Sequence, residues 1–249
     1  GAGVLLVLLK ILSLPVNQSI WGLLIVLFIA MVVVSQFMLT FGSDPNAKVT
    51  KKSKSPLSFH PIALIFGLLS FVSYLVEGAV GDWSALYLFE DKGIVIEEAV
   101  MGVMLFNGTM CIGRLLGNRL GKHLTSKQVV VGGYLLGSIA MGLIVFLPGH
   151  ASMYTYLLLG ISLAMIVPNL FSAMGEQNVI PMTQAVATST MLGYMGILMG
   201  PALIGFIAHG TSLTVAFIVL TTLLVVSAGI GKYAYHLMSK DCDLSEEQI

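Results

Sequence analysis

Long apolar segments alternate with short polar ones along almost the whole chain. A helix that spans a membrane needs about 20 consecutive, mostly apolar residues. Seven stretches fit that length, namely 20–40, 58–77, 99–116, 128–147, 153–173, 185–208 and 213–236. The stretch 58–77 also extends past a glycine break toward Phe89, and a shorter apolar run at 1–12 is interpreted as the end of a further, truncated helix.

The alternative of a membrane β-barrel does not fit this pattern. Barrel strands alternate apolar and polar residues over about ten positions, whereas these segments are continuously apolar and about twice that length. Backbone polar groups that face lipid must bond within their own segment, which favours helices. The sequence therefore predicts an all-α integral membrane protein.

The composition supports this class and excludes others. Hydrophobic residues make up 57% of the chain and charged residues 10%, against about 25% charged in a soluble domain. The formal net charge is zero, so no nucleic-acid partner is expected. The sequence has no metal-ligand cluster, phosphate-binding loop or nucleophile–base set, so we expect neither an enzyme nor a cofactor.

Basic residues predict the orientation of the helices. They gather in the polar linker 42–56, in the turn after residue 116 and at the C-terminal end, which alternating spans place on one side. Acidic residues gather on the other. Because lysine and arginine favour cytoplasmic loops, the linker and the C-terminus are expected on the cytoplasmic side. The protein is expected to be a multi-pass protein of the inner (plasma) membrane.

One polar stripe lies on an otherwise apolar segment. Ser70, Ser73, Tyr74 and Glu77 recur three or four residues apart, a spacing that places them on one helix face. An ionised carboxylate at the bilayer centre costs about 2.5–3.5 kcal/mol, so Glu77 is the main candidate for a substrate or proton pathway. The alternative is an interfacial carboxylate that reaches water near the outer end. Asp82 is interpreted as a break or cap of the helix.

Other spans carry further candidates. Pro168 interrupts a helix beside Asn169, which is either a polar site at membrane depth or a packing contact with a neighbouring helix. Tyr194 lies on a helix face that could reach a central cavity. Arg114 is assigned to gating or to a structural role rather than to substrate contact. The structural alternatives are pairing with a carboxylate or backbone carbonyls, and snorkelling to the interface. Close helix packing is predicted for small residues and a proline on one helix, namely Gly193, Gly196, Gly200 and Pro201.

Several of these stretches resemble a known family. Residues 112–123 read IGRLLGNRLGKH, which is similar to the short cytoplasmic loop G-x-x-x-D-R-x-G-R-R of the major facilitator superfamily. Asn118 stands in place of the aspartate, and Arg114 stands where the first glycine is expected. The positions that match are Arg119, Gly121 and Lys122.

Three more stretches resemble the fucose-permease-like, YbjJ-type bacterial branch of that superfamily. They are EGAVGDWSALYL at 77–88, PNLFS at 168–172, and GYMG at 193–196 followed by GPALIGF at 200–206. The resemblance covers residues 58 to about 238. It implies that 1–42 ends an N-terminal six-helix half, 43–57 links the halves, 58–238 forms helices seven to twelve, and 239–249 is a tail.

The resemblance also implies a function. The expected protein is a secondary active transporter of a small polar solute, with or without a co-transported proton, whose missing N-terminal half completes the central cavity. Drug or metabolite efflux, and a sensor or scaffold that keeps the fold without transport, remain alternatives. A membrane-embedded enzyme is a weaker one. The substrate, the direction of transport and the oligomeric state do not follow from the sequence.

Overall fold

The computed structural model describes residues 16–41, 60–120, 124–176 and 180–246. The apolar run 1–12, the linker lysines, and the motif residues Gly121 and Lys122 lie outside these ranges. The chain divides into two units, residues 1–54 and 55–249, which are described separately.

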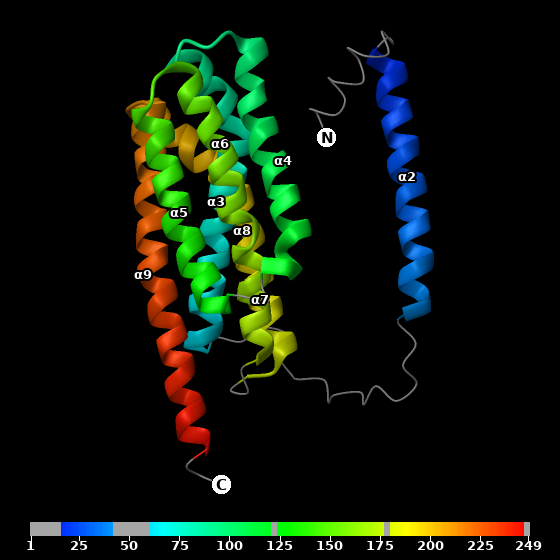
Figure 1. The fold of residues 1–249 in the computed structure, drawn as a ribbon, viewed down its shortest axis with the longest axis vertical. Coiled ribbons are helices and arrows are strands. Elements are labelled where there is room, and N and C mark those ends of the chain that lie inside the picture. The colour runs from blue at the N-terminus through cyan, green and yellow to red at the C-terminus, as the bar shows by residue number, and fades with distance from the viewer. Residues whose placement is uncertain (1–15, 42–59, 121–123, 177–179, 247–249) are drawn as a thin grey trace. The chain divides into compact units, whose positions relative to one another are not determined.

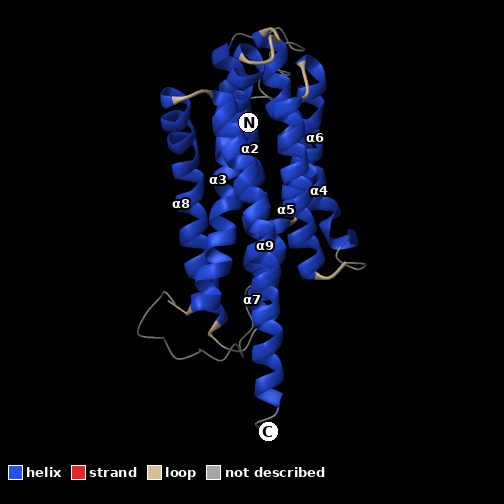
Figure 2. Cartoon of the chain, turned by 90° about the vertical axis from the view of Figure 1, so that its left-hand side faces the viewer, coloured by secondary structure: helices blue, strands red, loops and turns tan. Residues whose placement is uncertain are grey.

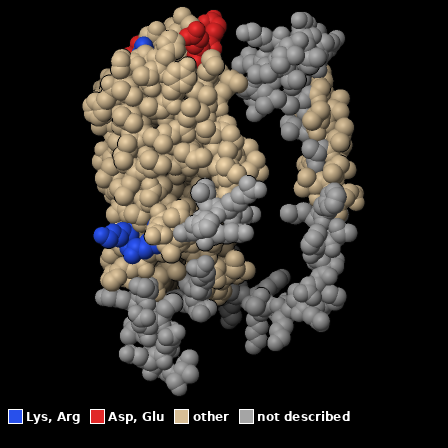
Figure 3. Space-filling model, in the orientation of Figure 1, with Lys and Arg blue, Asp and Glu red and all other residues tan. Residues whose placement is uncertain are grey.

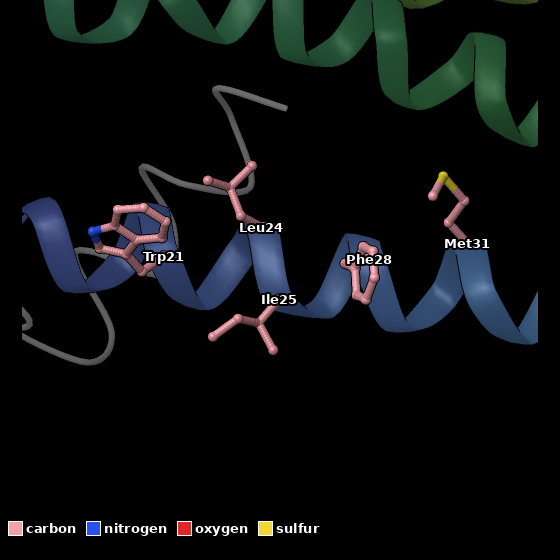
Figure 4. Close-up of a pocket in the computed structure, with 5 residues that line it drawn as sticks. All are labelled: Trp21, Leu24, Ile25, Phe28 and Met31. Atoms are coloured by element: carbon pink, nitrogen blue, oxygen red, sulfur yellow. The ribbon is translucent and has the colours of Figure 1, made fainter.

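The first unit contains one described helix, α2 (Val16–Phe41), which covers the predicted span 20–40. Its apolar side chains stand out from the helix, and Figure 4 shows five of them: Trp21, Leu24, Ile25, Phe28 and Met31. These five residues come from one helix and carry no polar group other than the indole of Trp21, so they offer no chemistry for a site.

The second unit is a bundle of seven helices, with no strand among its described residues (Figures 1 and 2). The helices are α3 (Pro61–Glu90), α4 (Ile96–Leu120), α5 (Ser126–Phe146), α6 (Gly149–Ala164), α7 (Ile166–Glu176), α8 (Met182–Gly210) and α9 (Leu213–Glu246). Taken with α6 and α7 as one interrupted segment, they give six spans long and apolar enough to cross a membrane. The predicted all-α membrane class is confirmed.

Helix α3 continues through the glycines where the sequence predicted a break. It runs unbroken for 30 residues, and Asp82 lies exposed inside it rather than capping it. The physical reason is packing: Gly78 fits against α8, where an added Cβ would come within 2.8 Å of the Ile197 carbonyl oxygen. The helix starts at Pro61. His60 precedes it as the N-cap, and its side chain accepts a hydrogen bond from the Ile62 amide at 3.4 Å.

The predicted span 153–173 is interrupted as expected, three residues before its proline. Helix α6 ends at Ala164, Met165 has φ −102° and ψ −6°, and α7 starts at Ile166. Pro168 has no amide hydrogen and its ring crowds the carbonyl of the residue four positions earlier, Ala164. The interruption therefore falls where proline cannot support regular helical hydrogen bonds.

The helices differ in how deeply the bundle buries them. Within the apolar window of each span, 61% of α3 is buried, against 28% of α4 and 22% of α8. Helix α3 is thus the central element, whereas α4 and α8 have the largest faces left uncovered by the second unit.

Charged side chains separate toward the two ends of the bundle (Figure 3). The end formed by the α3–α4 connection carries Glu90, Asp91, Glu97 and Glu98, with Lys92 as its one described lysine or arginine. We call it the acidic end. Basic side chains gather toward the opposite end, near the start of α5.

Candidate functional site

Glu77 forms an ion pair at the level of the middle of α3. It is the seventeenth of the helix's 30 residues, and its Oε2 lies 3.3 Å from Nη2 of Arg114 on α4. The Glu77 side chain is 23% exposed and that of Arg114 is 46% exposed. The two ends of α3 therefore lie well beyond Glu77 on both sides, which argues against a carboxylate that simply reaches water at the helix end.

Two tyrosines extend this pair toward α8. The rings of Tyr74 and Tyr194 are stacked, with centroids 6.2 Å apart and planes 7° from parallel. Gly193 makes room for this contact, because a Cβ there would meet the Tyr74 ring at 2.6 Å. Tyr74 is also close enough to both Glu77 and Arg114 to interact electrostatically with them. We call Tyr74, Glu77, Arg114 and Tyr194 the Glu77 site.

The site is partly open and holds both charges and aromatic surface. Tyr194 is 62% exposed, and the Arg114 guanidinium can donate to a solute oxygen in a bidentate manner. Glu77 can accept hydrogen bonds or, when protonated, donate one. The site can therefore bind a polar molecule and exchange a proton.

The structure separates Ser73 from the Glu77 site. Ser73 is buried, and its Oγ lies 2.8 Å from the hydroxyl of Tyr134 on α5. Tyr134 donates to the Leu69 carbonyl oxygen at 2.7 Å, so Ser73 is the donor in the serine–tyrosine bond. Ser70 is also fully buried. The predicted stripe therefore divides, because different helices cover it: Ser73 faces Tyr134 of α5, whereas Glu77, one turn further along, meets Arg114 of α4.

Asn169 does not join the site through any hydrogen bond in the described residues. Its side-chain nitrogen donates to the Met165 carbonyl oxygen of the same chain segment at 2.8 Å. The bond to a neighbouring helix, one of the two alternatives for Asn169, is absent from the described hydrogen bonds. Asn169 instead satisfies a carbonyl at the interruption between α6 and α7.

The glycines of α8 lie directly against the backbone of α3. An added Cβ would collide with the Phe71 carbonyl at Gly196 and with the Leu75 carbonyl at Gly200. Pro201 leaves the Ile197 carbonyl without its usual helical donor, and Gly78 packs there. The Trp83 indole donates to the Pro201 carbonyl oxygen at 2.9 Å. We call this set the α3–α8 contact.

Sequence reasoning missed three residues of these arrangements. Trp83 and Gly78 stand in the stretch interpreted as a helix break, and Tyr134 stands in an apolar span. For Gly78, the signal was its position opposite the G-x-x-G-x-x-x-G spacing of α8. Of the loop motif, Asn118 and Arg119 lie in the last turn of α4, but their side chains lie outside the described residues.

The sequence of the chain is similar to those of known membrane proteins. The chain is 40% identical over 172 residues to an uncharacterized MFS-type transporter of Yersinia pestis, an alignment that covers 68% of this chain and 44% of the relative. The chain belongs to the major facilitator superfamily. No family model matches the sequence.

Two further comparisons agree with a superfamily fold. The membrane protein MosC of Rhizobium meliloti is 30% identical over 170 residues, covering 67% of this chain and 42% of the relative. The crystal structure of the E. coli fucose:proton symporter matches with a TM-score of 0.61 at 16% identity, covering 70% of this chain and 42% of that one. This superfamily chain is a multi-pass membrane protein that spans less than half the length of the relatives it matches.

Proposed function

We propose that this chain is the C-terminal half of a secondary active transporter that moves a small polar solute by alternating access. The observation that carries the proposal is the Glu77–Arg114 ion pair at mid-helix depth. Ionisable residues inside membrane spans are rare, and they mark substrate, ion or proton pathways. The transporter named among the relatives supports the same class of activity.

The four residues of the Glu77 site have different roles in this proposal. Arg114 pairs with Glu77 and favours its ionised form while the site is empty. A solute that hydrogen-bonds to Arg114 weakens the ion pair, so Glu77 takes up a proton more easily. The movement of the solute is thereby coupled to that of a proton. The stacked rings of Tyr74 and Tyr194 give a flat surface for the apolar face of a sugar-like solute, in keeping with the fucose:proton symporter among the structural neighbours.

The missing partner in this scheme is the N-terminal half of the same protein. Helices α4 and α8 leave the largest faces uncovered, so we propose that these faces meet that half and slide against it as the two halves rock. Residues 58–238 would then be helices seven to twelve. Residues 43–57 and the C-terminus would lie on the cytoplasmic side of an inner membrane.

The test uses the full-length protein in liposomes that contain a pH-sensitive dye. Fucose and a panel of other monosaccharides are added outside, and proton entry is recorded for the unaltered protein and for Glu77→Gln. We expect at least one sugar to drive proton entry, and Glu77→Gln to reduce the rate by about tenfold or more, because one interaction of a charged group contributes about 1.5–3 kcal/mol.

Glu97→Gln is the matched control, since it removes a carboxylate in the first turn of α4, away from the Glu77 site. It should leave the rate unchanged. Solute-driven proton entry that is the same in Glu77→Gln and in the unaltered protein would contradict the role of Glu77.

A further inference from the structure

A cavity lies at the acidic end of the bundle and shares no residue with the Glu77 site. Its volume is about 430 Å³, and it is formed where α3 and α8 end and α9 begins. An aromatic side chain, two carboxylates and a histidine line it: Trp83, Glu90, Asp91 and His209. We call it the end cavity.

The aromatic wall of the end cavity is held in a fixed position. The Trp83 indole nitrogen donates to the Pro201 carbonyl oxygen at 2.9 Å. Its ring also lies against Gly205, where a Cβ would come within 2.8 Å of the ring carbon Cζ2. The glycine and the hydrogen bond together orient a rigid aromatic surface beside the cavity.

The charge beside this wall is negative, with two carboxylates against one neighbouring lysine. Asp91 accepts a hydrogen bond from the Thr214 hydroxyl at 2.8 Å, and Glu90 has no hydrogen bond or ion pair within the part of the chain that is described. Lys92 directs its ammonium group to the Val145 carbonyl oxygen at 2.6 Å and over the Tyr87 ring. Burial lowers the pKa of Lys92, and the attraction of Asp91 opposes part of that shift, so Lys92 offsets some of the charge of Asp91.

We propose that the end cavity binds a small organic ammonium ion. Cations are attracted to the face of a tryptophan ring, and the carboxylates of Glu90 and Asp91 supply the opposite charge. An anionic ligand would be repelled by both. A metal ion is a poorer candidate, because the described residues hold no group of three or more side chains that could ligate one.

Two sources could supply this ammonium group. The cavity lies where three spans end, at the level where a bilayer meets water, so the ligand is either a free amine or the headgroup of an ammonium-bearing phospholipid. In both cases the ligand contacts Trp83, which is hydrogen-bonded to Pro201 inside α8. Binding at the end cavity therefore stabilises the α3–α8 contact.

Choline is the probe for the test. The full-length protein is placed in nanodiscs of phosphatidylglycerol, which carries no ammonium group, and choline chloride is titrated against sodium chloride of equal ionic strength by calorimetry. We expect saturable binding in the millimolar range. The double variant Glu90→Gln and Asp91→Asn should weaken it by about tenfold or more, and Trp83→Phe by about threefold.

Glu97→Gln again serves as the matched control and should bind choline normally, because Glu97 is at the same end but outside the cavity. Both carboxylates of the double variant are exposed, so the variant is expected to fold, and its melting temperature checks this. The absence of saturable choline binding, or an unchanged affinity in the double variant, would overturn the proposal.

A second arm identifies the source of the ammonium group. Part of the phosphatidylglycerol is replaced by phosphatidylethanolamine or, for comparison, by the same fraction of a neutral galactolipid. Weaker choline binding with phosphatidylethanolamine alone indicates that the lipid headgroup occupies the end cavity. Equal choline binding with the two lipids indicates a free amine. Both results support the ammonium site, and neither depends on the proposed role of Glu77.

Discussion

Helix α3 carries two polar arrangements only four residues apart, and they differ in nearly every physical respect. Ser73 is buried, and the Ser73–Tyr134–Leu69 hydrogen bonds satisfy one another inside the bundle. Glu77 is partly exposed, is charged, and pairs with a more exposed Arg114 across a longer distance. A polar residue in a membrane helix thus does not indicate function by itself. Two properties distinguish a group that holds helices together from one that can bind a solute: the exposure of its side chain and the charge of its partner.

The α3–α8 contact, like the hydrogen bonds of Ser73 and Tyr134, holds helices together. Substitutions in it should give the largest effect on stability. Gly196→Ala places a Cβ against the Phe71 carbonyl, and backbone cannot move aside as a side chain can. We expect a loss of about 2–3 kcal/mol in the free energy of unfolding, measured by titration with a denaturing detergent.

Gly132→Ala is the opposite case on α5, where no atom lies within 4 Å of the added Cβ. It should leave stability unchanged or raise it by up to about 1 kcal/mol, since alanine favours helices over glycine. Equal destabilisation by the two substitutions would remove the steric account of the α3–α8 contact.

The buried hydrogen bonds come next in size. Tyr134→Phe removes the hydroxyl that joins Ser73 to the Leu69 carbonyl, and we expect it to destabilise the protein by about 1–3 kcal/mol. Tyr154→Phe, at a tyrosine that is 58% exposed, should change stability by less than about 0.5 kcal/mol. A Tyr134→Phe variant as stable as Tyr154→Phe would mean that these bonds do not fasten the bundle.

The Trp83 hydrogen bond should give the smallest effect. Trp83→Phe keeps an aromatic ring but leaves the Pro201 carbonyl without its indole donor, which should cost about 1 kcal/mol. The melting temperature of the full-length protein provides the measurement. Trp21→Phe, at an exposed position on α2, serves as the comparison, and a matching change in both variants would argue against a specific role for the bond.

Hydrophobic patterning predicted the membrane class and the positions of the spans, because each span must satisfy its own backbone hydrogen bonds within an apolar environment. It placed Glu77 and Arg114 on different helices without joining them, and only the packing of α3 against α4 brings them together. It misjudged Asp82 and grouped Ser73 with Glu77, since helical spacing gives the direction of a side chain but not the helix that covers it. The end cavity was beyond sequence reasoning, because α3, α8 and α9 meet there only in the folded chain.

The central claim is that Glu77 serves transport whereas the buried bonds of Tyr134 serve the fold. The most direct measurement compares Glu77→Gln and Tyr134→Phe in one full-length protein, recording solute-driven proton entry and the free energy of unfolding for each. We predict that Glu77→Gln loses transport and keeps its stability, and that Tyr134→Phe, once inserted and folded, transports but unfolds more easily. Transport that survives in Glu77→Gln, combined with a loss of stability like that of Tyr134→Phe, would contradict the account.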